Sequence, residues 1–294
     1  MKKVLIVLIL TAFLTPAFCQ DETQEKKGPD PVRFTFGTAL LIENQTVESP
    51  YKGGIELQIQ HRFSLIENID NLFGIYGSAN TRIGLNYGIT DRIMVGAGTT
   101  KDYKLQDVNW KYKILQQKED NSMPVSLSYY GNVVLDARPD DAFGPEASYE
   151  FIHRFSYFTQ LIVARKINDM FSVQVAPSLA YFNAVPRYSD TTGYKNMNFA
   201  IHAGARANLF GNHSLMIEYD QLLTKQELEG SQELEDKQPK PNLTLGWEIS
   251  TATHCFQVFA TSYSNIINQY NLLYNTNDFT KGEFLFGFNI TVRF

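Results

Sequence analysis

Apolar and polar residues alternate along the chain in short runs that turn residues separate. In the last run, residues 283–294, every second position from Phe284 to Phe294 is apolar, and the positions between are mostly polar. A period of two is that of an extended strand with one apolar and one polar face, so the pattern predicts an all-β fold. We count thirteen runs, at residues 32–42, 54–63, 81–87, 92–99, 107–114, 124–135, 155–167, 171–182, 198–209, 214–222, 243–250, 255–263 and 283–294.

The connections between these runs alternate in length. Tight turns are predicted at residues 168–169, 211–212 and 251–253. Long loops are predicted at residues 136–149, 186–197, 224–241 and 265–282. Short turns on one rim and long loops on the other are typical of outer-membrane barrels, whose short turns lie in the periplasm. A soluble β-sandwich would not show this asymmetry, so we predict a single transmembrane antiparallel β-barrel with long extracellular loops.

The strand count depends on the first run. Both ends of such a barrel lie in the periplasm, which requires an even number of strands. Counting back from residue 294 gives twelve strands within residues 54–294, and residues 32–53 are then an N-terminal segment in the periplasm or in the lumen, where a plug is one role open to it. The alternative is fourteen strands, with residues 32–42 as the first strand and one weak strand missed at 64–80 or 265–282. We favour twelve.

The composition agrees with a barrel and argues against a helical membrane protein. Aromatic residues make up 13% of the chain, whereas the mean hydropathy of -0.23 is polar and no long apolar run lies beyond residue 14. In a membrane barrel only alternate residues need to be apolar, which accommodates both values. The net charge of -5 is mild, so we expect no nucleic-acid partner. The expected partners are outer-membrane lipids and an envelope protein of unknown identity.

The N-terminus predicts export. Lys2 and Lys3 precede an apolar stretch at residues 4–14 that is too short to span a bilayer, and Ala17-Phe18-Cys19 resembles a cleavage site. Residues 1–19 are therefore a predicted signal peptide, and the polar residues 20–31 a flexible lead-in. Lipidation of Cys19 is the less favoured alternative, because Phe18 is bulky where such signals carry a small residue. Cleavage leaves Cys255 as the one remaining cysteine, so no disulfide framework is expected.

The polar face of the runs carries twelve charged residues, six cationic and six anionic. We predict that they line the lumen, where each must be solvated or paired because unpaired burial costs several kcal/mol. The even balance predicts no strong ion selectivity, and it is compatible with either an open channel lining or a salt-bridged filler. The candidate lumen-lining residues are Glu56, Arg62, Arg82, Asp107, Lys111, Lys113, Arg206, Glu218, Asp220, Glu248, Glu283 and Arg293.

Catalytic and metal sites have little support in the sequence. A hydrolase needs a nucleophile, a histidine base and an orienting group, and only His202 is placed to act as such a base. No two His, Cys or carboxylate residues stand at a recognisable metal-site spacing. We expect that the protein uses no cofactor and is not an enzyme. The tyrosines of the predicted loops form either an external recognition surface or a cover over the barrel mouth, and we favour the cover; they are Tyr188, Tyr194, Tyr270 and Tyr274.

Two short motifs resemble a known family. Residues 59–63, Ile-Gln-His-Arg-Phe, and the hairpin at residues 87–98 are similar to a family of uncharacterised β-barrel proteins of Gram-negative outer membranes, a domain of unknown function. The family's usual Ser or Arg-Ser after this hairpin is Thr99-Thr100 here, so no role is assigned to that position. The terminal strand also resembles the closing strand of such barrels, which implies that Phe294 is part of a signal read by the barrel-insertion machinery. A more distant likeness is to the barrel components of gliding and protein-secretion machines.

Three functions follow from this interpretation. The leading hypothesis is a passive pore or small-solute transport barrel of unknown substrate, porin-like and located in the outer membrane. The second is a structural or docking barrel of an envelope or secretion complex. The third is an outer-membrane lipid hydrolase that uses His202. Fold alone does not choose between them.

Overall fold

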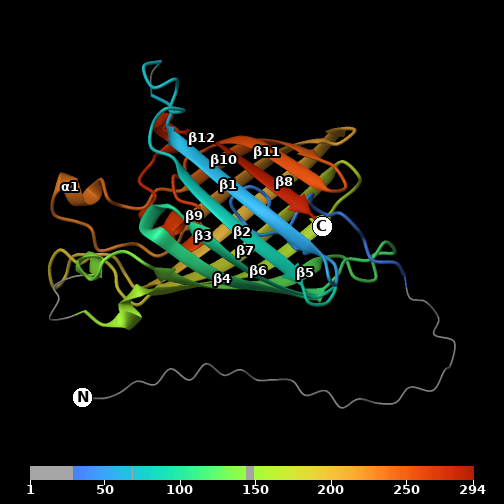
Figure 1. The fold of residues 1–294 in the computed structure, drawn as a ribbon, viewed down its shortest axis with the longest axis horizontal. Coiled ribbons are helices and arrows are strands. Elements are labelled where there is room, and N and C mark those ends of the chain that lie inside the picture. The colour runs from blue at the N-terminus through green and yellow to red at the C-terminus, as the bar shows by residue number, and fades with distance from the viewer. Residues whose placement is uncertain (1–28, 68, 144–148) are drawn as a thin grey trace, which may run out of the picture.

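Twelve antiparallel strands form a closed barrel in the computed structural model, which describes residues 29–67, 69–143 and 149–294. Each strand pairs with its neighbours in sequence, and β1 pairs with β12 (Figure 1). This confirms the all-β barrel and the count of twelve, and it excludes fourteen. The strands are β1 Ile55–Leu65, β2 Asn80–Gly88, β3 Ile93–Thr100, β4 Leu105–Leu115, β5 Ser126–Asp136, β6 Phe155–Lys166, β7 Phe171–Phe182, β8 Met197–Phe210, β9 His213–Leu222, β10 Asn242–Ser250, β11 His254–Thr261 and β12 Leu285–Arg293.

The predicted signal peptide at residues 1–19 lies outside the described residues, as does most of the lead-in at 20–31. Within the described part, no helix is both long and apolar enough to cross a bilayer. The membrane-facing surface instead comes from the alternation along each strand. Ile83 and Val258 point outward with 51% and 59% of their surface exposed, whereas the adjacent Arg82 and Gln257 are buried inside. Lipid would cover this outer apolar belt.

The two rims of the barrel differ, as the connection lengths predict. At one rim the N–H of Ile55 donates to the Phe294 carbonyl at 3.1 Å, and the Phe294 N–H donates to the Ile55 carbonyl at 2.9 Å. The first residue of β1 and the residue after β12 thus close the barrel there. This short-turn rim also carries the connections within β2–β3, β6–β7, β8–β9 and β10–β11. The opposite, long-loop rim has one short connection, residues 101–104, between β3 and β4.

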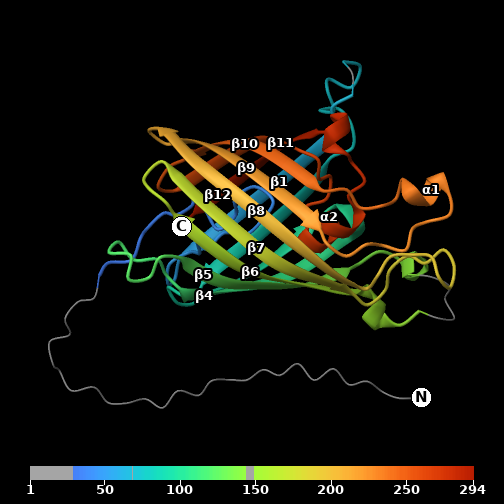
Figure 2. The same ribbon diagram turned by 180° about the vertical axis from the view of Figure 1, so that it is seen from behind.

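The helices lie in the connections of the long-loop rim, and Figure 2 shows α1 and α2 at this end. The α-helices are α1 Gln232–Glu235 and α2 Asn268–Tyr274, and the 3-10 helices are η1 Asp102–Lys104, η2 Asp140–Phe143, η4 Phe151–Arg154 and η5 Phe279–Lys281.

Residues 35–47 lie inside the barrel, and we call them the lumenal segment (Figure 1). All of them except Gly37 are buried. The segment forms a tight loop, in which the Leu41 N–H donates to the Asn44 carbonyl at 2.8 Å and the Thr46 N–H to the Ala39 carbonyl at 2.9 Å. None of it pairs with a barrel strand, so residues 32–42 are not a strand of the barrel.

The interior is more apolar than the inward charges suggest. Phe36, Leu41, Ile42 and Val47 of the lumenal segment belong to one buried cluster with inward residues of the wall. The wall members on β5 and β6 are Tyr130, Val134, Phe158, Ile162 and Ala164. β5 and β6 therefore carry apolar side chains on both their outer and their inner faces. The apolar residues of the lumenal segment pack against the inner face.

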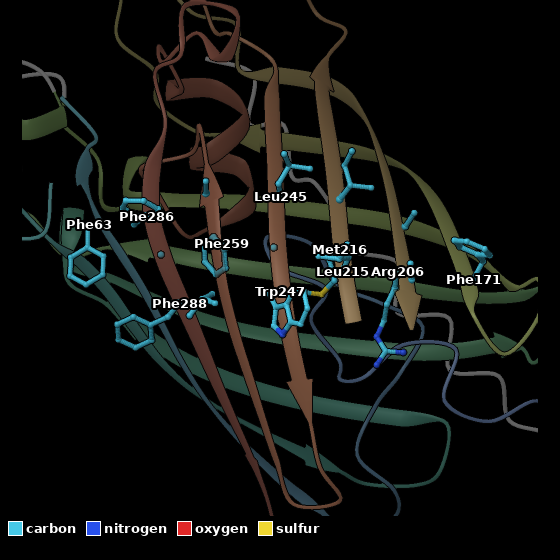
Figure 3. A pocket seen from close by; sticks show the side chains of 17 residues that line it. Phe63, Phe171, Arg206, Leu215, Met216, Leu245, Trp247, Phe259, Phe286 and Phe288 are labelled. Atoms are coloured by element: carbon cyan, nitrogen blue, oxygen red, sulfur yellow. The ribbon is translucent and has the colours of Figure 1, made fainter. Parts of the chain in front are cut away.

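A hollow of about 880 Å³ opens on the outer surface over β8–β12 (Figure 3). Outward residues such as Leu245, Trp247 and Phe286 line it. Gly246, Gly287 and the buried Phe259 also border it. Because the lining is apolar and lies on the membrane-facing surface, acyl chains of the bilayer account for it.

Candidate functional site in the barrel lumen

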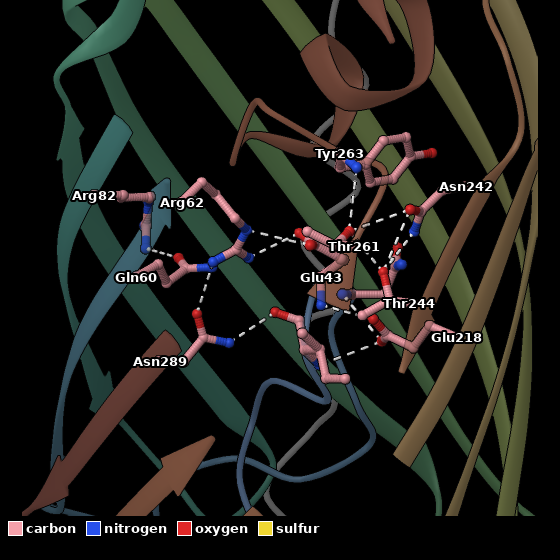
Figure 4. Close-up of polar contacts among 12 residues, drawn as sticks. Glu43, Gln60, Arg62, Arg82, Glu218, Asn242, Thr244, Thr261, Tyr263 and Asn289 are labelled. Atoms are coloured by element: carbon pink, nitrogen blue, oxygen red, sulfur yellow. Dashed lines mark hydrogen bonds and ion pairs between the residues drawn. The ribbon is translucent and has the colours of Figure 1, made fainter. Parts of the chain in front are cut away.

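The lumenal segment is held on one side by a single carboxylate of β9. Glu218 Oε2 accepts the N–H of Glu43 at 2.7 Å, and its Oε1 accepts the N–H groups of Ile42 and Asn44 at 3.3 Å each (Figure 4). Three consecutive backbone N–H groups that converge on one anion form a nest. The tip of the segment belongs to no helix or strand, so its three buried N–H groups need another acceptor. The buried carboxylate of Glu218 provides it.

On its other side the same tip binds β1. The guanidinium of Arg62 donates to both carboxylate oxygens of Glu43, at 2.8 and 3.2 Å, and to Asn289 Oδ1 at 3.1 Å. It also lies over the ring of Phe259, 4.4 Å from the centroid. Two parallel charge-assisted hydrogen bonds are among the strong polar contacts in proteins. The tip is therefore fixed between β9 and β1 (Figure 4).

Further donors of the wall surround the segment and bind its backbone carbonyls. Lys111 Nζ of β4 donates to the carbonyls of Ala39 and Glu48 at 3.1 and 2.7 Å. The remaining donors are Gln174 on β7 to Gln45, Gln257 on β11 to Leu41, Asn289 on β12 to Ile42 and Arg293 on β12 to Gly37. Gln160 on β6 donates to the side chain of Asn44 at 3.5 Å, so seven strands contribute polar contacts to one loop of chain.

Two inward glycines of the wall mark the space that the segment occupies. A Cβ added to Gly204 on β8 would lie 2.6 Å from Leu41 Cδ2, and one added to Gly246 on β10 would lie 2.6 Å from Ile42 Cδ1. Both distances are too short for a real contact. The wall therefore leaves out side chains where Leu41 and Ile42 sit, and the segment fills the bore in their place.

A second insertion enters from the long-loop rim. Helix α2 lies in the connection between β11 and β12, and Gln269 at its start donates to Asn132 Oδ1 at 3.0 Å. Asn268 donates to the carbonyl of Glu43 at 3.2 Å, so the two insertions meet inside the barrel. Between them remains a cavity of about 20 Å³, bordered by Arg82 and Asp107 among others. That volume holds about one water molecule.

The structure brings most of the predicted lumen residues together in pairs. Arg82 binds Asp107 at 2.7 Å, Arg206 binds Glu248 at 2.8 Å, and Arg293 lies 3.7 Å from Glu56. Arg62, Lys111 and Glu218 bind the lumenal segment, and Asp220 accepts from Asn44 Nδ2 at 2.9 Å.

Two predicted residues lie at the margins. Lys113 sits where β4 bulges near the short-turn rim and is partly exposed. Glu283 precedes β12 in the loop, where its carboxylate accepts the Asp278 N–H at 2.6 Å.

Charge counting missed the uncharged side chains of the site. Gln174, Gln257 and Asn289 bind the segment, and each stands on the inward parity of its strand. Their inward parity in the sequence was a signal that could have identified them as lumen-facing. Glu43 had no comparable signal, because it belongs to no strand and its partner Arg62 lies on a separate run.

His202 lies inside the barrel wall with both ring nitrogens occupied. Its Nδ1 is 3.0 Å from Asp220 Oδ1, and its Nε2 is 3.0 Å from Gln174 Nε2. The arrangement contains the base and its orienting carboxylate, but an amide stands where a hydrolase would place its nucleophile. His202 on β8 thus links Asp220 on β9 and Gln174 on β7, and this group of three side chains lies beside the lumenal segment.

The family model described as Membrane bound beta barrel domain (DUF5777) matches residues 36–294. The chain belongs to this family. The resemblance expected from the two motifs is therefore confirmed, and the match includes nearly all of the lumenal segment as well as the barrel. No curated protein matches the sequence.

Solved structures show the same fold. The NanC porin superposes with a TM-score of 0.51 at 6% sequence identity, over 81% of this chain and 98% of the porin. An outer-membrane channel from Pseudomonas putida F1 gives a TM-score of 0.48 at 11% identity, over 84% of this chain and 97% of the channel. At such low identity the likeness concerns the barrel fold alone.

Proposed function

We propose that this DUF5777 barrel is an outer-membrane pore for small polar solutes and that the lumenal segment is its gate. The observation that carries the proposal is that the bore is filled by an inserted loop and not by side chains of the wall. The glycines at 204 and 246 leave room into which Leu41 and Ile42 extend. Moving the segment out would empty the bore on its side, and displacement of α2, which contacts the segment through Asn268, would complete the opening. A bore of twelve strands is wider than the self-filled eight-strand case.

The polar contacts of the segment are of a kind that water can replace, and they stand beside the apolar cluster that Phe36, Leu41, Ile42 and Val47 form with the wall. The wall groups that bind it are carboxylates, amides and cationic side chains, so they would become hydrated when the segment leaves. A hydrogen bond between neutral groups is worth only about 0.5–1.5 kcal/mol net, and one to a charged group about 1.5–3 kcal/mol, because water takes over the partners. These replaceable polar contacts support a removable gate.

The orientation supports a gate on the periplasmic side. Barrels of this kind place both chain ends and the short turns in the periplasm. The lumenal segment is directly N-terminal to β1, and Val32 before it hydrogen-bonds the Gln117 carbonyl in the β4–β5 connection of the short-turn rim. Residues ahead of the segment would thus lie where a periplasmic protein could draw it out.

Single-channel conductance in planar bilayers tests the proposal. The refolded chain from Gln20 should give few or no steps, and a chain starting at Lys52 should give frequent steps. A matched control replaces residues 35–47 by a Gly-Ser sequence of equal length, which keeps the chain but removes its side chains, and should also conduct. Silence of all three, with barrel folding verified by circular dichroism and heat-shifted gel mobility, would refute the pore.

A second candidate is a docking barrel of an envelope complex. The observation that favours it is the closure from both rims, since α2 as well as the lumenal segment occupies the bore. A barrel that only anchors a partner has no need for an open lumen. It becomes the leading candidate if the truncated chain folds and does not conduct, and a protein that co-purifies at fixed stoichiometry would then support it.

A further inference from the structure

A cavity of about 570 Å³ opens at the long-loop rim, on the outer side of α2. Its floor is formed by Tyr270 and Tyr274 of α2, and its walls include Tyr103, Phe182 and Tyr194. These five rings form one cluster, with centroids 5.1 Å apart for Tyr103 and Tyr270 and 5.4 Å apart for Tyr194 and Tyr274. We call this cavity the aromatic bowl. Its size is that of pockets that enclose small molecules.

The charged residues of the bowl are mostly cationic. Arg138, Arg154, Arg187 and Lys237 line it, and Asp136 is the one carboxylate among its lining residues. Asp136 is already neutralised, because Arg138 binds it through Nε at 3.0 Å and through Nη2 at 2.6 Å. Arg154 is likewise paired with Asp140 and Lys237 with Glu233, so among the described residues Arg187 is the cation of the bowl that has no carboxylate partner, and it gives the bowl its positive charge.

Several hydrogen-bond donors of the bowl are unused. Within the described chain, Nη1 of Arg138 and the whole guanidinium of Arg187 have no protein partner, and neither do the hydroxyls of Tyr103 and Tyr274. Burial raises the pKa of the Tyr103 and Tyr274 hydroxyls, so both keep their protons and can donate. Donors without partners around an aromatic cavity are available to an acceptor on a ligand.

A cationic ligand is the alternative that tyrosine rings allow, since aromatic cages bind ammonium groups. Two features disfavour it. The guanidinium of Arg138 already covers the ring of Tyr103, 4.5 Å from its centroid, and the guanidinium of Arg187 would repel a second charge of the same sign. A ligand with a carboxylate group fits these features, because guanidinium groups bind carboxylates through parallel hydrogen bonds.

We propose that the aromatic bowl binds a small carboxylate carried on a ring, with Arg187 and Arg138 Nη1 on the carboxylate and the tyrosine rings against the ring face. The binding itself does not need an open lumen. Its role as the entry site for a transported solute rests on the proposed pore, since α2 forms both the floor of the bowl and the outer closure of the bore.

Saturation-transfer difference NMR on the chain from Gln20 in a neutral detergent tests the binding. The probes are two matched pairs, glucuronate with methyl glucoside and benzoate with benzyl alcohol. We expect the carboxylate of at least one pair to bind at least tenfold more tightly than its neutral partner. Preference for glucuronate would identify an acidic sugar, and preference for benzoate an aromatic acid. Equal or absent binding within both pairs would overturn the assignment.

Variants locate the site. Arg187→Gln removes an exposed cation without a partner, and should weaken carboxylate binding about tenfold while the barrel folds normally. Tyr274→Phe keeps the ring and should give a smaller loss. Arg92→Gln, an exposed arginine on the short-turn rim, is the matched control and should change nothing. An equal loss in the Arg92 variant would mean general charge attraction and would contradict the site. Because these measurements use the closed full chain, their result is independent of the conductance result.

Discussion

The carboxylate of Glu43 and the guanidinium of Arg62 lie 2.8 Å apart with no exposed surface on either side chain, although Glu43 belongs to the lumenal segment and Arg62 to β1. Among the residues that the structure describes, neither charge has another ionic partner within 4.0 Å, so each depends on the other for its burial. The pair is a point at which gate and wall are energetically coupled. It also makes the coupling testable, because the wall can be altered without touching the segment.

Removing one member of this pair should unseat the lumenal segment. In Arg62→Gln, Glu43 is left as an uncompensated buried charge, a loss of about 3–5 kcal/mol in comparable buried pairs. We expect a raised open probability in bilayers and faster proteolysis within residues 35–47. In the double variant Glu43→Gln/Arg62→Gln no charge is stranded, so most of the effect should disappear. A double variant as open as the single one would show that the ion pair does not hold the gate.

The nest on Glu218 predicts a local effect on hydrogen exchange. Glu218→Gln removes the charge and one of the two acceptor oxygens that hold the N–H groups of residues 42–44. Hydrogen bonds to a charged group contribute about 1.5–3 kcal/mol, so amide exchange at these residues should be at least about tenfold faster. Deuterium uptake followed by mass spectrometry measures it. Glu233→Gln on the exposed α1 is the control, and unchanged uptake in the Glu218 variant would count against the nest.

A steric wedge should open the barrel from the wall side. Gly246→Leu places side-chain atoms where Ile42 now lies, and the barrel wall is held by strand pairing that the substitution leaves intact. We expect conductance like that of the chain starting at Lys52. Ala260→Leu, on the neighbouring β11 but on the outward parity, should remain closed. If both variants stay closed while folded, Ile42 is not what blocks the bore.

The C-terminal phenylalanine should matter for insertion more than for stability. The side chain of Phe294 is 66% exposed, and its backbone bonds to Ile55 do not need the ring. Phe294→Ala should therefore refold in detergent with nearly unchanged thermal stability, yet reach the outer membrane in a much smaller amount in cells. Fractionation and heat-shifted gel mobility measure the two effects. Normal assembly in cells would remove Phe294 from the proposed insertion signal.

The sequence was a good guide to the wall because strand pairing and lipid exposure both act on alternate residues. Runs such as 54–63 and 283–294 lie within one or two residues of β1 and β12 at most ends. It was a poorer guide to the inner face. Tyr130 and Phe158 stand on inward positions although both are aromatic, because the lumenal segment supplies them with apolar neighbours. A pattern along one strand cannot show a partner that lies far away in the chain.

The predicted loop tyrosines illustrate the same limit. The sequence allowed Tyr270 and Tyr274 to form a cover or a recognition surface, and the structure places both in α2, packed into the mouth, where they also form the floor of the bowl. Covering and recognition are thus compatible in one helix. That outcome depends on contacts with Tyr103 and Phe182, which come from other connections and strands.

The sequence by itself determined that this chain is a membrane barrel, which face of each strand is lipid-facing, and which rim carries the long loops, since these properties follow from residue period and from connection length. It favoured twelve strands over fourteen, and the structure decided that count because residues 32–42 pair with no strand of the barrel. The tertiary structure alone decided what fills the barrel. The seating of residues 35–47 depends on Glu218, Arg62, Lys111 and two wall glycines that stand far apart in the sequence. Their convergence is a consequence of barrel closure, which brings distant strands around one bore and lets a loop with no strand pattern of its own bind them all.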